Sequence, residues 1–183
     1  MKCFSRFVRE HDASCGCYGF DRGFWTTRQR DAKLFRLGEL EYELLCEGEG
    51  EKAIGLHIPS DASLEMNRLN ASLSKARDFL NRHFPDWANA PIRCSSWLLS
   101  PALKDLLPPG SRILGFQAAF DLTGTKPEAD DVVQWVFGLS EAQKAGCRLE
   151  DLPENTTLRR NMKALMGAGG SVGTAEGILA RAF

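Results

Sequence analysis

His57 and Cys94 are two side chains whose types suit reaction chemistry. His57 ends the apolar run KAIGLH and stands two residues before Pro59. Histidine suits proton transfer because its ordinary pKa lies near neutrality. A cysteine beside a histidine can form a nucleophile with its base, and this is one interpretation of Cys94 with His57. The sequence supplies no orienting third group for the pair, so a buried structural thiol and a structural histidine are the simpler alternatives.

The segment after His57 predicts a strand that passes into a long helix. The first turn of a helix presents free backbone N–H groups and a positive dipole end, which bind anions such as phosphate. The junction reads PSDASLEMN: it has no glycine, Pro59 has no N–H, and Asp61 adds a negative charge. Arg68, about two turns along, is the nearby cation. On these residues alone a turn explains the junction better than a phosphate cradle.

The elements that must position these residues follow from the hydrophobic period. The clearest is a helix over residues 63–83, because its apolar residues repeat every 3.6 positions. These residues are Met66, Leu69, Leu73, Ala76 and Leu80. Ser60, Asp61 or Ser63 can cap this helix, and Pro85 ends it. The helix should therefore pack its apolar stripe on a sheet.

Alternating apolar residues predict a β-hairpin over residues 37–58, with GEGE as its loop and a bulge near Gly38. Three acidic residues alternate with the apolar ones: Glu39, Glu41 and Glu43. Acids in this pattern can bind a cationic substrate, but they more simply form the solvent face of the hairpin. Strands 52–58 and 91–97 should be neighbours in the sheet.

The remaining segments predict further helices and strands. Helices are expected at residues 2–13, 20–35, 101–107, 128–137 and 155–167, and strands at 111–124 and 177–183. The glycine cluster GAGGSVG follows a helix, so Gly167, Gly169 and Gly170 indicate a helix end and a tight turn and not a dinucleotide-binding loop. This order of elements favours an α+β fold whose mixed, mainly antiparallel sheet is flanked by helices.

Composition excludes several classes of protein. A chain of 183 residues that is 43% hydrophobic and 26% charged is typical of one globular domain. A net charge of −1 gives no support for a nucleic-acid or membrane partner. The sequence shows no membrane-spanning run and no signal-peptide core, which predicts a cytoplasmic protein. The six cysteines are then free thiols, and Cys15-Gly16-Cys17 is too closely spaced for a zinc site, so no metal is expected.

Several phrases of the sequence carry a resemblance to a known family. They are YGFDRGFWTTRQ, LFRLGELEYEL, LHIPSDASL, CSSWLLSPALKDLLPPGSRILGFQAAFDL and the closing glycine turn. Together they resemble the C-terminal half of a bacterial family of GNAT-like N-acyltransferases, which carry an added helical N-terminal domain. The resemblance implies a GNAT-like domain over residues 35–183 and a remnant of the helical domain over residues 1–34. The chain would then be a truncation, a natural short form or half of a split protein.

The resemblance also implies roles for individual residues. The cofactor would be acetyl-CoA or another acyl-CoA, used as substrate to acylate a small-molecule amine that the sequence does not identify. His57 would be the catalytic base, and Ser96 would assist the leaving thiol. The residues implied at the acyl-CoA are Ile58, Ser60, Asp61, Ala62, Ser63, Arg68 and Ser95. GNAT enzymes usually hold pyrophosphate with a glycine-containing loop, which the junction lacks, so a weakened site is expected.

Two questions stay open at this point: whether the domain is catalytic, and what covers an apolar aromatic group. The chain could be a non-catalytic GNAT-like module with a structural or partner-binding role, which the glycine-free junction favours. Phe20, Phe24 and Trp25 form an apolar group that needs cover, so they should pack on the sheet or form a homodimer contact.

Overall fold

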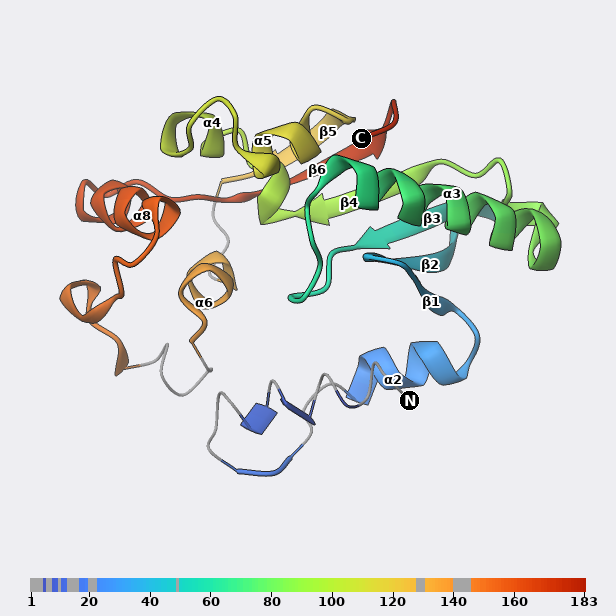
Figure 1. Ribbon diagram of the computed structural model, residues 1–183, viewed down its shortest axis with the longest axis horizontal. Helices are drawn as coiled ribbons and strands as arrows, with labels where there is room; N and C mark the ends of the chain where they lie inside the picture. The colour runs from blue at the N-terminus through green and yellow to red at the C-terminus, as the bar shows by residue number, and fades with distance from the viewer. Residues whose placement is uncertain are drawn as a thin grey trace.

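A six-stranded mixed sheet forms the centre of the computed structural model (Figure 1). The structure describes residues 5, 8–9, 11–12, 17–19, 23–48, 50–127, 131–139 and 146–183. Its strands are β1 (Leu34–Leu37), β2 (Leu40–Glu47), β3 (Glu51–His57), β4 (Ile92–Ser96), β5 (Phe120–Lys126) and β6 (Thr174–Leu179). Its helices are α2 (Gly23–Arg30), α3 (Met66–His83), α4 (Leu103–Leu106), α5 (Arg112–Gln117), α6 (Asp131–Phe137) and α8 (Thr157–Gly167).

The strands lie in the order β1-β2-β3-β4-β6-β5. β3 and β4 pair in parallel, and the other neighbouring pairs are antiparallel. The predicted α+β class, with a mixed and mainly antiparallel sheet, is therefore confirmed. The predicted neighbourhood of strands 52–58 and 91–97 is confirmed as well.

Helix α3 covers one face of the sheet (Figure 1). Its predicted apolar stripe is buried, with Leu69, Leu73, Ala76 and Leu80 at most 3% exposed, while Met66 is only partly buried at the edge of the same core. The side chains that it meets come from the strands and from α5: Leu40, Tyr42, Ile54, Leu56, Cys94 and Phe116. The helix thus fixes which face of each strand points into the core.

The predicted start and caps of this helix are wrong. α3 begins at Met66, its N-cap is Glu65, and no side chain caps it. The side chains of Asp61 and Ser63 make other contacts instead: Asp61 pairs with Arg36, and Ser63 Oγ accepts the N–H of Glu65. Residues between Pro59 and the helix therefore form a loop of their own.

A second core lies beyond one end of the sheet, where α4, α6 and α8 gather (Figure 1). Its buried residues are Leu103, Leu106, Val132, Val136, Phe137, Leu152, Met162 and Val172. The predicted glycine turn ends α8: Gly169 has a φ of 79°, and the N–H of Gly170 reaches the carbonyl of Leu165 at 2.9 Å. Glycine tolerates this left-handed conformation, so the predicted helix end is confirmed.

The predicted strand over residues 111–124 is wrong in its first half, which forms α5. Ser111 Oγ caps this helix by accepting the N–H of Ile113 at 3.3 Å, and Phe116 and Gln117 are buried on one side of it. Gln117 Nε2 then donates to the carbonyls of Leu98 and Ser100 at 2.9 Å. The last strand was also placed too late, because β6 spans Thr174–Leu179 rather than residues 177–183.

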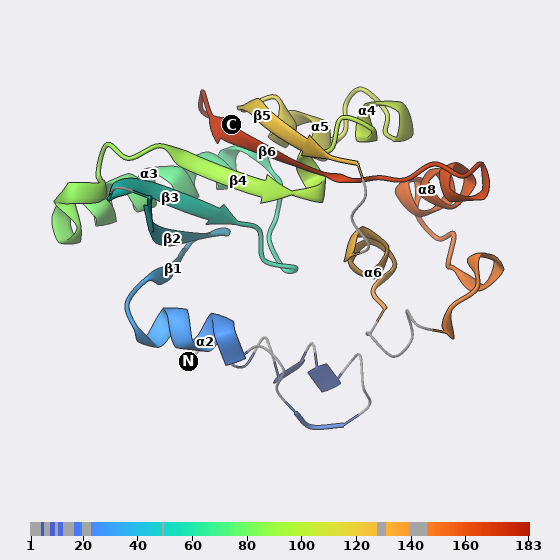
Figure 2. The same ribbon diagram turned by 180° about the vertical axis from the view of Figure 1, so that it is seen from behind.

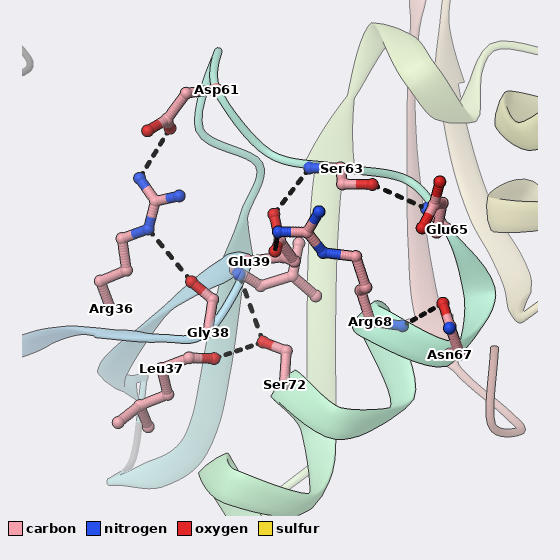
Figure 3. A network of polar contacts seen from close by, with 11 residues as sticks. Arg36, Leu37, Gly38, Glu39, Asp61, Ser63, Glu65, Asn67, Arg68 and Ser72 are labelled. Atoms are coloured by element: carbon pink, nitrogen blue, oxygen red, sulfur yellow. Dashed lines mark hydrogen bonds and ion pairs between the residues drawn. The ribbon is translucent and has the colours of Figure 1, made fainter.

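The predicted hairpin is confirmed, because β2 and β3 pair antiparallel. A further strand, β1, precedes it, and Gly38 lies in a tight turn between β1 and β2 and not in a bulge. Gly38 has a φ of 80°, and a Cβ there would meet Ser72 Cβ at 3.1 Å. Ser72, on α3, holds this turn: its hydroxyl donates to the Leu37 carbonyl and accepts the Leu40 N–H at 3.2 Å (Figure 3). The Tyr42 hydroxyl also lies 3.2 Å from Ser72 Oγ.

Replacing Ser72 with Ala should lower the free energy of unfolding by about 1–3 kcal/mol. The side chain is 1% exposed, so its loss leaves the Leu37 carbonyl and the Leu40 N–H buried without this partner. Ser74→Ala, at an exposed position of the same helix, is the control and should change stability by less than about 0.5 kcal/mol. Urea unfolding of both variants measures the difference, and equal stabilities would contradict the role given to Ser72.

Some predictions fall partly or wholly outside the described residues. Most of the helix expected at 2–13 does so, and so does Phe20. No helix among the described residues is long and apolar enough to cross a membrane. Within the same residues, no three His, Cys, Asp or Glu side chains are grouped so as to hold a metal ion. The cytoplasmic location, the homodimer and the division at residue 34 stay predictions.

Candidate active site at the diverging strands

β3 and β4 begin side by side and then separate. The two parallel strands pair only at Ile54 with Ile92 and at Gly55 with Arg93. Beyond these pairs β4 pairs with β6, from Arg93 to Ser96, while β3 continues along β2 to His57. The ends of β3 and β4 thus open a gap in the sheet between His57 and Ser96. Figure 2 shows the two strands from the face opposite α3.

His57 points to the face opposite α3 and contacts a carboxylate there. Its Nε2 lies 2.9 Å from Glu43 Oε2, and Glu43 Oε1 lies 2.9 Å from Nε of Arg28 on α2. Glu43 and Glu41 are 7% and 3% exposed, so the prediction that they form a solvent face is wrong. The reason is that α2 brings Arg28 to this side of β2 and covers Glu43.

Trp25 of α2 also contacts His57. The two rings meet edge to face with centroids 4.6 Å apart, and the side chain of Trp25 is partly buried. The prediction that the aromatic group packs on the sheet is thus confirmed for Trp25. Phe24 is 56% exposed, and its ring is tilted against that of Trp25 with the centroids 5.0 Å apart.

A hollow of about 480 Å³ opens beside His57 on the same face of the sheet. Its polar lining includes Glu47, Arg93, Ser95, Thr123 and Glu176, and its apolar lining includes Leu45, Leu56 and Ile178. Two of the acids are paired, Glu47 with Arg93 and Glu176 with Lys126. The hollow can take a polar group of moderate size next to the imidazole.

The small residues at the end of β4 separate into two faces. Ser95 is exposed and lines the hollow together with His57. Ser96 Oγ accepts the N–H of Leu98 at 3.1 Å and so caps the 3₁₀ turn at Trp97–Leu99, which leaves its own proton available for donation. Cys94 is 2% exposed within the core, and burial raises the pKa of its thiol to about 12. A thiolate nucleophile at Cys94 is therefore contradicted.

The junction between β3 and α3 is filled by a carboxylate of the protein itself (Figure 3). Glu39, from the turn between β1 and β2, accepts the Ser63 N–H at 2.7 Å and pairs with Arg68. The pKa of Glu39 lies below its ordinary value, mainly because of the hydrogen bond from the Ser63 N–H and to a smaller extent because of Arg68. This side chain is therefore charged at neutral pH. Glu39 thus already contacts two of the groups that were expected to meet phosphate.

The other expected cofactor residues lie along the same loop. Ile58 is partly buried against the main core, Ser60 is exposed, and the Ala62 N–H donates to the Pro59 carbonyl at 2.9 Å. Asp61 lies 2.7 Å from Arg36 (Figure 3). The structure therefore brings His57, the serines and the loop to one end of β3 and β4, while several of the loop's donors are engaged within the protein.

Sequence reasoning missed Arg28 and dismissed Glu43 and Glu39. Glu43 contacts His57 because β2 and β3 pair in a register that sets Glu43 opposite Gly55, with His57 on the same face. Strict alternation of Glu39, Glu41 and Glu43 with apolar residues was the signal, since it places acids on the face that also carries His57. Nothing in the sequence indicated that α2 would cover that face.

The model of a family described as the GNAT-like C-terminal domain matches residues 34–179. This chain belongs to that family. The resemblance to GNAT-like acyltransferases is thereby confirmed. No curated protein matches the chain.

Solved structures of acyltransferases share the fold of this GNAT-like domain. One, in complex with decanoyl-CoA, is 30% identical with a TM-score of 0.87, and the match covers 97% of this chain and 55% of that one. A second, with decanoyl-CoA and teicoplanin, is 29% identical with a TM-score of 0.85, over 95% and 55% of the two chains. A mutant with octanoyl-CoA is 30% identical with a TM-score of 0.85, over the same shares. The chain thus spans about half the length of the acyltransferases that it matches.

Proposed function

We propose that this GNAT-like domain transfers an acyl group from acyl-CoA to an amine, with His57 as the catalytic base. The observation that carries the proposal is the hydrogen bond between His57 and buried Glu43 beside the gap between β3 and β4. The acyltransferases that share the fold are bound to decanoyl-CoA or octanoyl-CoA, which supports an acyl-CoA as the donor and a medium-length chain as the first to test.

The reaction needs a base, a held thioester and a leaving thiol. In the neutral imidazole whose Nε2 donates to the Glu43 carboxylate, Nδ1 keeps a lone pair. The amine nitrogen attacks the thioester carbonyl, its proton passes to Nδ1, and the C–S bond then breaks. The thiolate of CoA leaves and recovers the proton, so the products are an amide and CoA. Oriented groups of this kind supply a large part of the rate.

We assign the two sides of the gap to the two substrates. The pantetheine arm would lie between β3 and β4, where the hydroxyls of Ser95 and Ser96 can bond its amides or the leaving sulfur. The amine would enter the hollow beside His57, whose lining carries both carboxylates and a guanidinium. One structural neighbour binds teicoplanin, and we include that compound among the amines to test.

The phosphates of CoA would lie at the loop from Ser60 to Ser63, with Arg68 as a nearby cation. There they compete with Glu39, which accepts the Ser63 N–H and pairs with Arg68. Two anions cannot share these donors without repulsion, so the Glu39 carboxylate must move off the Ser63 N–H and Arg68 when acyl-CoA binds. This competition, rather than Asp61, is the main reason to expect a weak site.

Replacing Glu39 with Gln should tighten the binding of decanoyl-CoA about two- to five-fold. The substitution removes the resident charge and keeps a side chain of the same size, and one charge near a helix start accounts for about 0.3–1 kcal/mol. Asp61→Asn is the matched control: it removes an equal charge from the loop that Glu39 contacts, but Asp61 pairs with Arg36 instead. Its effect should be smaller. Calorimetric titration measures both constants, and weaker binding by Glu39→Gln would overturn the competition.

Mass spectrometry of a mixture of the protein, decanoyl-CoA and candidate amines tests the proposed function. We expect an amine product heavier by one decanoyl group, and free CoA in equal amount. The non-catalytic module, which is the alternative, requires neither product. It is less well supported, because a structural module has no need for a histidine held by a buried carboxylate.

A further inference from the structure

Arg28 and His57 share the two oxygens of one carboxylate. Arg28 Nε lies 2.9 Å from Glu43 Oε1, and His57 Nε2 lies 2.9 Å from Glu43 Oε2. The side chain of Glu43 is only 10% exposed, whereas that of Arg28 is 40% exposed. A carboxylate held on both oxygens cannot rotate freely, so the place of Oε2 relative to the imidazole depends on Arg28.

Helix α2 holds the guanidinium in place from its other side. The Cζ atom of Arg28 lies 5.2 Å from the ring centre of Trp25 and 5.3 Å from that of Phe24, distances at which a cation and an aromatic ring attract. Trp25 in turn meets the edge of His57. The four side chains Arg28, Trp25, Glu43 and His57 form one continuous set of contacts, which we call the α2 clamp.

We infer that Arg28 is a positioning residue of acyl transfer that acts on His57 through Glu43. The inference rests on the proposed function, in which His57 is the base. Without Arg28, the Glu43 carboxylate loses its contact with a guanidinium and keeps its contact with His57. Its negative charge is then no longer balanced by that of Arg28. An imidazole beside an unbalanced carboxylate is protonated more easily, and the protonated form has no lone pair for the amine. Arg28 therefore keeps the base oriented and free to accept a proton.

Other charged groups face His57, and their pairing differs from that of Arg28. Glu41 lies opposite His57 on β2, and it is buried. Around the hollow, Arg93 pairs with Glu47 and Lys126 pairs with Glu176. These ion pairs balance their own charges. Removal of Arg28 thus changes the charge next to Glu43 and leaves those pairs intact.

Arg28→Met tests the inference, with Arg30→Met as the matched control. Both residues lie on α2, but Arg30 is 79% exposed and pairs with Asp31. Nitrogen-15 NMR of the histidine side chains follows His57 directly, and its signal is assigned by its loss in His57→Gln. We expect Arg28→Met to move the midpoint of His57 protonation about 0.5–1 pH unit higher, the scale on which one nearby charge acts. Arg30→Met should leave this midpoint unchanged.

Acyl transfer supplies the second readout. In Arg28→Met the acidic limb of the rate profile should move to higher pH by the same amount, while the Kd for decanoyl-CoA stays within two-fold of wild type. Arg28→Lys keeps the positive charge but lacks the planar guanidinium group. It should therefore restore the wild-type midpoint of His57 protonation but only part of kcat. Equal His57 midpoints in Arg28→Met and Arg30→Met would overturn the role of Arg28. A wild-type protein that acylates no amine would instead overturn the proposed function, and the NMR midpoint would still report whether Arg28 acts on His57.

Discussion

His57→Gln should slow acyl transfer about 10²–10⁴-fold and leave the binding of decanoyl-CoA almost unchanged. A base that takes the amine proton in the transition state contributes about this factor. Glutamine keeps a polar side chain next to Glu43 but cannot accept the proton at neutral pH. Because the loss concerns the transition state, kcat should fall and the Kd for acyl-CoA should not. Single-turnover kinetics with decanoyl-CoA and an acceptor amine separates the two quantities.

His83→Gln is the matched control for this experiment. His83 is exposed at the end of α3 and contacts Phe79, so it lies outside the α2 clamp. Its substitution should leave kcat unchanged. Equal rates for wild type and His57→Gln would show that His57 is not the base, whether or not acyl-CoA binds between β3 and β4.

Phe116→Ala should lower the free energy of unfolding by about 3–5 kcal/mol, the usual loss for a buried aromatic ring. Phe116 is fully buried, stacks on Phe183 at 5.3 Å and lies 5.0 Å from Phe120. Its loss leaves a cavity at the point where α5, β5 and the C-terminal residue meet. Since domains of this kind have a total stability of about 5–15 kcal/mol, the variant should be near its folding limit.

Phe24→Ala makes the same chemical change at a ring that is 56% exposed. It removes contacts with Trp25 and Arg28 but creates no cavity, so we expect a loss below about 1 kcal/mol. Urea unfolding measures both variants. A loss at Phe116 no larger than the loss at Phe24 would contradict the place of Phe116 in the core.

The sequence predicted the parts of the fold that depend on local pattern. Helix α3 was predictable, apart from its start and caps, because its apolar stripe repeats over about four turns. The glycine turn after α8 was predictable because glycine tolerates positive φ. Residues 112–117 were mistaken for part of a strand because apolar and aromatic residues in a short run fit both periods. In this segment, the cap at Ser111 and the hydrogen bond of the buried Gln117 amide stabilise a helix instead.

The candidate site was less predictable, because it depends on contacts between distant segments. His57 was found from its residue type and its place before Pro59. Its partner Glu43 depends on strand register, in which a slip of one residue would turn the acid to the opposite face. Arg28 depends on where α2 packs, and Glu39 depends on a turn that brings it to the loop before α3. None of these placements follows from a local pattern.

Titration of the folded wild-type protein with decanoyl-CoA tests whether the diverging strands bind acyl-CoA. We expect saturable binding at one site, and a stabilisation of about 2.7 kcal/mol when the ligand is at a hundred times its Kd. Glu39→Gln should bind more tightly in the same titration. A folded protein that shows neither heat of binding nor stabilisation with decanoyl-CoA, octanoyl-CoA or free CoA would rule out acyl-CoA binding at the diverging strands.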